Sequence, residues 1–519
     1  MKKRIFALFL SALLLATVLC ACGDGKPEED ASGFGSDGTS SSGEAVTGGE
    51  LVVGISQDLG DSLDPYQMAA AGTREVLFNV FEGLIKADYT GDYVPAVASD
   101  YTVSEDGLTY TFPLREGVLF HNGDAVTPED VVYSFETCAA TSNETDLIAA
   151  LSVIQNIAVE GNSVVITLSE ADANFISYAA MVHIVPDDYT EQATAPVGTG
   201  PFKFVSRSVQ ESVVLEKFAD YWGEGAYLDK VTLKIFEDPN ALMSALSAGT
   251  VDMANHLTID QVDTLDTEQF RVVEGTMNLV QALYLNNGVE PFNNEKVRQA
   301  MCHAIDVDAI LELTSAGYGA KLGTSIYPSF TKYFDESLVG YYEYDVEKAK
   351  ALLAEAGYPD GFSMSITIPS NYTPHMNVGE VIVEQLAQVG ITAEIVPVEW
   401  ETWLSETYVG RDFDSTVIGF DAATLNAGAL LNRWMSTNES NMINFNNAEY
   451  DAAMKAAMAC TDEAEQTELY KEAAAILTET AANVYIQDLA DFLVMKADLD
   501  GYQFYPMYVM DLAKVHYVG

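Results

Sequence analysis

Hydrophobic and polar positions follow two different spacings in the second half of this chain. Residues 362–368 alternate as in a strand, whereas the apolar residues of 378–389 recur at helical spacing and are followed by Gly390, a residue that commonly ends helices. Residues 391–395 alternate again. Because a strand, a helix and a second strand at this spacing form a right-handed crossover between parallel strands, the pattern predicts an α/β domain.

The same two spacings recur elsewhere along the chain. We predict strands at 51–55, 108–114 and 164–168, and helices at 297–305, 448–458 and 463–480. A further helix is predicted to begin at Thr127, because Thr caps helices, Pro128 fits the first helical position and the acids Glu129 and Asp130 suit the positive end.

The first 22 residues form a targeting segment rather than part of the fold. Three basic residues precede an apolar run that ends in Leu19-Cys20-Ala21-Cys22, which predicts a lipoprotein signal peptide over 1–21 and lipidation of Cys22. Residues 22–50 then form an acidic linker rich in Gly and Ser, which is too polar to fold alone. No later stretch reaches about 18 consecutive apolar residues, so the lipid is the only predicted membrane contact.

Composition limits the partners of the chain. With 25 basic and 78 acidic residues the formal charge is −53, so we expect no nucleic-acid partner. Cys138, Cys302 and Cys460 are far apart, show neither a disulfide framework nor zinc spacing, and are predicted to be buried thiols.

No catalytic motif is present in the sequence. HExxH, GxSxG, a phosphate-binding loop and, after Cys22, CxxC are all absent, and the histidines are dispersed. We therefore expect a protein that is not an enzyme and that has no cofactor and no metal site. A secreted hydrolase assembled from distant residues stays as an alternative.

Several motifs occur in an order that carries a resemblance. They are LDP at 63–65, FNVFEGL at 78–84, SEDGLTYTFPLREGV at 104–118, FHNG at 120–123, TPEDVVYS at 127–134, PVGTGPF at 196–202, YWG at 221–223, PFNNEKVRQA at 291–300 and AID at 304–306. The ordered set resembles the family 5 extracellular solute-binding proteins of ABC importers, the oligopeptide, dipeptide and nickel group. We expect most of these motif residues to be architectural.

The resemblance implies an α/β, periplasmic-binding-protein-like fold of type II, cluster C. It has two α/β lobes around a hinge, plus an extra subdomain on lobe I. Lobe Ia would combine residues 51–85, 186–284 and 487–519, lobe Ib would be 86–185, and lobe II would be 285–486. The chain would cross between lobes near Leu285 and near Gln487, and ligand would bind between the lobes.

The resemblance also implies which residues hold a ligand. In peptide-binding members an aspartate receives the peptide ammonium, and strands from both lobes pair with the peptide backbone. Asp421 falls at that aspartate's place, after Ile418, Gly419 and Phe420. The remaining expected ligand-binding residues are Trp400 and Trp403 on lobe II and Tyr66, Met68, Ala69 and Ala70 on lobe I.

The sequence departs from the peptide binders after Asp421. Ala422-Ala423-Thr424-Leu425-Asn426 lacks the Tyr and the acidic-Pro pair that often follow. A different ligand shape is thus expected, and Arg433 is predicted to pair with a surface acid rather than with ligand. Nickel chelates, oligosaccharides and opines remain alternative ligands on the same fold.

These observations predict a monomeric, lipid-anchored binding protein that delivers a peptide to ABC permease subunits driven by cytosolic ATPases. It would lie on the outer face of the cytoplasmic membrane. This location corresponds to the cell surface in a Gram-positive-type cell and to the periplasmic space in a Gram-negative one.

Overall fold

The predicted strand–helix–strand crossover is present in the structure, a computed structural model that describes residues 43–519 except 69, 70, 173 and 267. It consists of β16 (Ser363–Pro369), α10 (Thr373–Ala387) and β17 (Thr392–Val398). The two strands pair in parallel along their whole length, which confirms the predicted α/β arrangement. The signal peptide, Cys22 and most of the linker lie outside the described residues, as do Ala69 and Ala70.

This crossover belongs to a six-stranded sheet with the order β15-β19-β14-β18-β16-β17. Its other strands are β14 (Val280–Leu285), β15 (Ala320–Lys321), β18 (Ser415–Phe420) and β19 (Asn483–Asp488). Alternate residues of β14 point into two different cores: Ala282 and Tyr284 into one, Leu283 and Leu285 into the other. All are buried, because helices cover both faces of the sheet.

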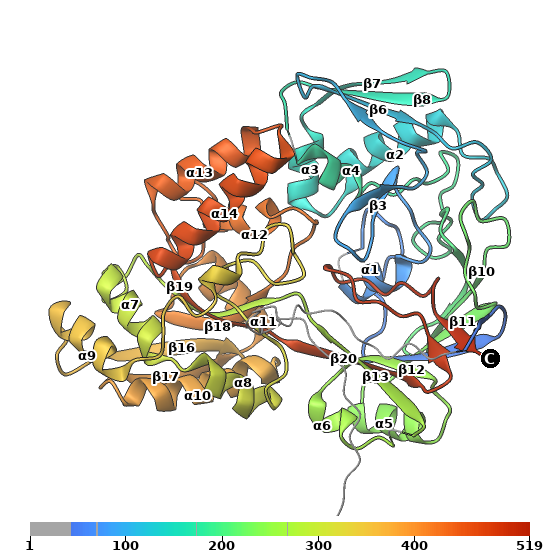
Figure 1. The fold of residues 1–519 in the computed structure, drawn as a ribbon. Coiled ribbons are helices and arrows are strands. Elements are labelled where there is room, and N and C mark those ends of the chain that lie inside the picture. Colours follow the sequence, from blue (N-terminus) through green and yellow to red (C-terminus); the bar gives the residue numbers. More distant parts are fainter. Residues whose placement is uncertain (1–42, 69–70, 173, 267) are drawn as a thin grey trace, which may run out of the picture. The chain divides into compact units, whose positions relative to one another are not determined.

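The helices on the two faces come from different parts of lobe II (Figure 1). One face carries α10 with α7 (Glu295–Ala304), α8 (Val307–Ser315) and α9 (Val346–Glu355). The other carries α12 (Gly428–Leu431), α13 (Ala448–Ala459) and α14 (Glu463–Glu479). Short helical segments complete this lobe: η1 (Glu336–Leu338), α11 (Trp400–Thr402), η2 (Trp403–Val409) and η3 (Asn432–Trp434).

A seven-stranded sheet with the order β13-β20-β12-β2-β11-β10-β9 forms the centre of lobe Ia. Its strands are β2 (Glu50–Ile55), β9 (Phe202–Ser208), β10 (Ser212–Lys217), β11 (Lys230–Ile235), β12 (Met253–Leu257), β13 (Phe270–Thr276) and β20 (Ala490–Lys496). Leu242 and Leu246 of α5 (Pro239–Ser247) pack on one face, beside α6 (Ile259–Val262). The opposite face contributes to a large core that includes α1 (Ala71–Leu77).

Lobe Ib is built on a smaller antiparallel sheet with the order β5-β6-β8-β7. Its elements are β5 (Thr102–Val103), β6 (Thr109–Pro113), β7 (Ile154–Glu160), β8 (Ser163–Leu168), α2 (Pro128–Thr141), α3 (Thr145–Leu151) and α4 (Phe175–Ala179). A hairpin of β3 (Ile85–Ala87) and β4 (Tyr93–Pro95) precedes it. The start of α2 at Thr127 is confirmed, with a capping box to Asp130.

The chain passes twice between the two large sheets. The first falls at 277–279, between β13 and β14, several residues before Leu285. The second falls at Leu489, between β19 and β20, two residues after Gln487. β14, β19 and most of β20 are buried, so the hydrophobic pattern does not change where the chain passes from one sheet to the other.

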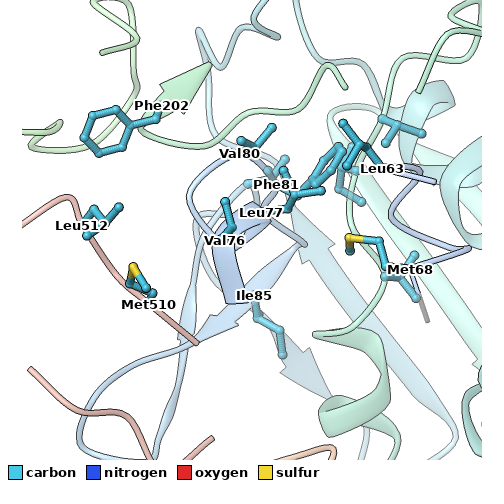
Figure 2. Packing of buried hydrophobic residues seen from close by; sticks show 14 of the residues in the cluster. Leu63, Met68, Val76, Leu77, Val80, Phe81, Ile85, Phe202, Met510 and Leu512 are labelled. Carbon is cyan, nitrogen blue, oxygen red and sulfur yellow. The ribbon is translucent and has the colours of Figure 1, made fainter. Parts of the chain in front are cut away.

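The C-terminal segment returns to lobe Ia and packs against α1. Figure 2 shows Met510 and Leu512 beside Val76 and Phe202. Buried Asn79 fixes this segment, since its Nδ2 donates to the Met510 carbonyl (2.7 Å) and its Oδ1 accepts from the Leu512 amide (2.9 Å). Near the end of the chain, β22 (His516–Val518) pairs with β1 (Ala45–Val46) on one side and with β21 (Leu499–Asp500) on the other.

The prediction of three buried thiols is correct for two of them. Cys138 in α2 and Cys302 in α7 are buried, and burial raises the pKa of each thiol to about 12. Cys460 is half-buried, because it caps the end of α13 where the chain turns toward α14.

Candidate functional site

A cavity of about 800 Å³ lies between the lobes. Its walls come from the loop before α1, the β3–β4 hairpin, α4, the loop at 221–225, the segment at 421–433 and the C-terminal segment at 503–514. Residues of lobes Ia, Ib and II therefore meet around one space, whose volume lies in the range typical of small-molecule sites.

The charges lining this cavity are nearly balanced, unlike those of the whole chain. The basic residues are Arg74, Lys86, Arg115, Arg433 and Lys514, and the acidic residues are Glu82, Asp88, Glu144, Glu224, Asp421 and Asp511. Since the chain carries 25 basic and 78 acidic residues, basic side chains are concentrated at the cavity. Such a lining favours a ligand that carries both positive and negative groups.

The wall from lobe I is organised around the carboxylate of Glu82, which is only 3% exposed. It accepts hydrogen bonds from Lys86 Nζ, Tyr221 OH and Trp222 Nε1, each at 2.7 Å. The guanidinium of Arg115 lies 4.4 Å from the Trp222 ring and donates to the Ala96 carbonyl. Glu82 thus pairs with Lys86, and its two further hydrogen bonds fix the rings of Tyr221 and Trp222 in the wall.

The C-terminal wall is supported from behind by a buried histidine. His256 lies between Asp491 and Glu75, 2.9 Å from each, and its ring stacks on Tyr508, which lines the cavity. Burial alone would lower the pKa of His256, but the two carboxylates raise it well above its ordinary value. A charged imidazolium thus connects β12, α1 and β20 behind Tyr508.

The wall from lobe II presents two charged side chains that have no partner of opposite charge among the described residues. Asp421 follows directly after β18 and is exposed in the cavity. Arg433, in η3, stacks its guanidinium 4.1 Å from the Phe420 ring. A carboxylate and a guanidinium left open on one wall can bind an ammonium and an anion, respectively.

The expected ligand-binding residues divide into two groups. Tyr66, Met68 and Asp421 line the cavity. The Tyr66 hydroxyl is already bound to the His183 carbonyl at 2.7 Å, so this side chain supplies a fixed apolar surface rather than a free donor. Ala69 and Ala70 lie outside the described residues.

The other expected residues stand behind the cavity wall. Ile418 and Gly419 pair with Ala282 and Gln281 of β14, and the Phe420 ring lies under Arg433. Trp403 is buried and donates from Nε1 to Thr416 Oγ1 at 3.0 Å, and Trp400 stacks on it. These five residues shape lobe II, and the cavity lining does not include them.

Sequence reasoning underestimated two sets of residues. Motif residues taken as architectural, Glu82, Arg115 and Trp222 among them, form the lobe I wall. Arg433 was expected to pair with a surface acid, but the structure places it in the cavity with no such partner among the described residues. One signal was available, namely the presence of arginine so soon after Asp421 in a chain poor in basic residues.

A pair of α/β lobes joined by two chain crossings, with one cavity between them, defines a two-lobe binding protein. The chain belongs to the bacterial extracellular solute-binding proteins, family 5, whose model matches residues 92–442. It is therefore an extracytoplasmic substrate-binding protein of an ABC importer and not an enzyme.

Individual relatives support this assignment over most of the chain. Heme-binding protein A of Haemophilus influenzae is 29% identical over 79% of this chain and 82% of its own length. The glutathione-binding protein GsiB of Pectobacterium atrosepticum is 30% identical over 79% and 83%. Among solved structures, DppA of Helicobacter pylori in complex with the peptide STSA matches 91% of this chain and 99% of its own, with 27% identity and a TM-score of 0.75.

Between residues 43 and 519, apart from the four positions not described, no helix combines the length and apolarity that a membrane span requires.

Proposed function

We propose that this protein captures peptides in the cavity between its lobes and delivers them to the permease subunits of its importer. The observation that carries the proposal is the exposed carboxylate of Asp421, which lines the cavity without an ion-pair partner among the described residues. A peptide ammonium would supply that partner, and a charge-assisted hydrogen bond would form between them.

The surrounding surface suits a peptide body. Tyrosine, phenylalanine and tryptophan side chains line much of the cavity, including Tyr66, Phe81, Tyr93, Trp222 and Tyr505. Aromatic faces accept varied side chains by apolar contact, which would allow a broad range of peptides. The related protein crystallised with a tetrapeptide, STSA, is consistent with such a ligand.

The position of the protein in the cell completes the proposal. We further propose that Cys22 is lipidated, that residues 22–50 form an acidic linker and that the protein is a monomer. The lipid and the linker would keep the binding protein near the permease. Permease subunits driven by cytosolic ATPases would accept the ligand when the lobes open.

A non-peptide solute is the second candidate, because one relative is named as a heme-binding protein. Oligosaccharides, opines and metal chelates would likewise fit within the same fold. Among the described residues, no group of three or more His, Cys, Asp or Glu side chains could hold a bare metal ion.

Native mass spectrometry of residues 51–519, followed by denaturation and identification of the released molecules, tests the proposal. A set of peptide masses is the expected result. Release of heme, a sugar, an opine or a metal chelate would contradict the peptide assignment and leave the importer class intact.

Asp421→Asn should weaken binding of the released peptides by about 1.5–3 kcal/mol, the range for a hydrogen bond to a charged group, as measured by titration calorimetry. Asp88→Asn is the matched control. This substitution removes a negative charge from the same cavity. The Asp88 carboxylate, however, already accepts hydrogen bonds from the backbone amides of Thr90 and Asp92 within its own turn. Equal affinities for Asp421→Asn and the wild type would remove Asp421 from the site.

A further inference from the structure

We infer that Arg433 binds a carboxylate of the ligand, and that Phe420 is the positioning residue that holds the guanidinium in place. The inference deepens the proposed function and rests on it, since it specifies that the captured peptide carries a negative group opposite its ammonium.

Arg433 differs from the other described arginines in its hydrogen bonding. Each of the others donates to at least one recorded acceptor: Arg74 to Glu144, Arg115 to Ala96, Arg207 to Gly60, Arg271 to Leu499, Arg298 to Ala481 and Arg411 to Asn444. Within the described residues no acceptor is recorded for Arg433, and its Nε is buried without a partner. A chain with 78 acidic residues offers many possible partners, so an arginine without one is free for a ligand.

Aromatic rings hold the side chain of Arg433 in place. The guanidinium lies 4.1 Å from the centroid of Phe420 and 5.9 Å from that of Trp434. Phe420 is in turn packed edge-on against Tyr284 and Trp434, with ring centroids 5.2 and 5.9 Å away. Aromatic contacts occupy the face of the guanidinium, which leaves the donors on its edge available.

The donors on the edge of the Arg433 guanidinium suit a carboxylate. A guanidinium edge matches the two oxygens of a carboxylate and can bind both at once, whereas a neutral amide offers a single oxygen without charge. Asp421 follows Phe420 directly, so the two open charges belong to one short stretch of lobe II. Together they would select a ligand with an ammonium and a carboxylate over one with an ammonium alone.

The carboxylate could be the carboxyl terminus of the peptide or an acidic side chain. Three pools of tri- to pentapeptides distinguish these sources: one with free carboxyl termini, one amidated and free of Asp and Glu, and one amidated but containing Asp or Glu. Binding of each pool to residues 51–519 is measured in competition by native mass spectrometry.

We expect the wild type to favour one of the two carboxylate-containing pools over the amidated neutral pool by roughly 10- to 100-fold, the range for a charged hydrogen bond. Preference for the first pool identifies the carboxyl terminus, and preference for the third identifies an acidic side chain. Equal binding of all pools would overturn the inference and leave peptide capture standing. Binding of no pool would overturn the proposed function and the inference together.

Substitutions then assign the preference to these residues. Arg433→Gln should abolish the carboxylate preference, and Arg433→Lys should keep part of it because the charge remains without the planar fork. Phe420→Leu should reduce the preference several-fold, whereas Phe420→Tyr, which retains the ring, should preserve it. Arg411→Gln, a lobe II arginine whose donors are used by Asn444 and Glu439, is the control and should not change it. An unchanged preference in Arg433→Gln would overturn the inference even if overall affinity fell.

Discussion

At the scale of single residues, buried charge is placed where the lobes join. Asp488 is fully buried at the end of β19, next to the second chain crossing, and its Oδ1 accepts from the amide of Leu279 in the first crossing (2.9 Å). Burial raises the pKa of this carboxyl to about 7, although its hydrogen bonds favour the ionised form. One carboxyl therefore links both chain segments that connect the lobes.

The raised pKa of Asp488 predicts a pH-dependent stability. In the unfolded chain the carboxyl titrates near 3.9, so its ionisation costs the folded protein stability as the pH rises from about 4 through 7. Asp488→Asn keeps the oxygen that Leu279 binds and removes this cost. The free energy of unfolding of the variant should equal that of the wild type near pH 4. By pH 8 it should be larger by on the order of 3–4 kcal/mol, as measured by urea unfolding.

The exposed Asp263 supplies the control, since Asp263→Asn should leave the pH dependence of the wild type unchanged. Parallel stability curves for Asp488→Asn and the wild type from pH 4 to 8 would show that the Asp488 carboxyl is not held neutral by burial.

At the scale of elements, local sequence sets where helices begin. The Thr127 side chain accepts from the Asp130 amide, and the Asp130 carboxylate accepts from the Thr127 amide at 2.8 Å. This capping box starts α2, whose buried residues Val131, Phe135 and Cys138 belong to the core of lobe I. Asp130 also accepts from the amide of Asp187, so the helix start is tied to a distant loop.

Loss of this cap should lower the stability of lobe Ib. Thr127→Ala removes the acceptor for the Asp130 amide and should reduce the free energy of unfolding by about 1 kcal/mol, whereas Thr127→Ser retains a hydroxyl and should cost much less. Chemical denaturation of both variants measures the difference. Equal stability of the alanine and serine variants would show that the cap contributes nothing.

At the scale of the whole binding unit, lobes Ib and II meet through a small buried polar cluster. Asn174 at the start of α4 donates to the Tyr470 hydroxyl of α14 (3.1 Å) and accepts from Gln466 (3.4 Å). A second contact joins Tyr93 of the β3–β4 hairpin, whose hydroxyl accepts from the Leu425 amide at 2.8 Å. Both contacts join lobe Ib to lobe II, so they favour the arrangement in which the two lobes are in contact.

Asn174→Ala should therefore shift the protein toward an open form. We expect a larger radius of gyration without ligand by solution X-ray scattering, and a several-fold weaker peptide affinity, since a neutral hydrogen bond contributes about 0.5–1.5 kcal/mol. Asn156→Ala, at an exposed position of β7 in the same lobe, is the control and should alter neither quantity. A radius and an affinity equal to those of the wild type would show that this cluster does not hold the lobes together.

The sequence predicted more of the fold than of the site. Strands β2, β6, β8, β16 and β17 and helices α2, α7, α10, α13 and α14 follow from spacing and caps, which depend on neighbouring residues. For the candidate site, the family resemblance predicted the position of Asp421 at the end of a strand. The displacement of Trp403 into the core could not be predicted, because it depends on Thr416, a residue on a different element.

The sequence by itself determined the α/β class, the family and the order of the elements, because periodicity, capping and motif spacing are properties of short stretches. Only the tertiary structure decided which side chains face the cavity. Glu82 meets Trp222, and Arg433 lies over Phe420 without an acidic partner among the described residues. These contacts join different elements, so their geometry depends on how whole lobes pack and not on local pattern.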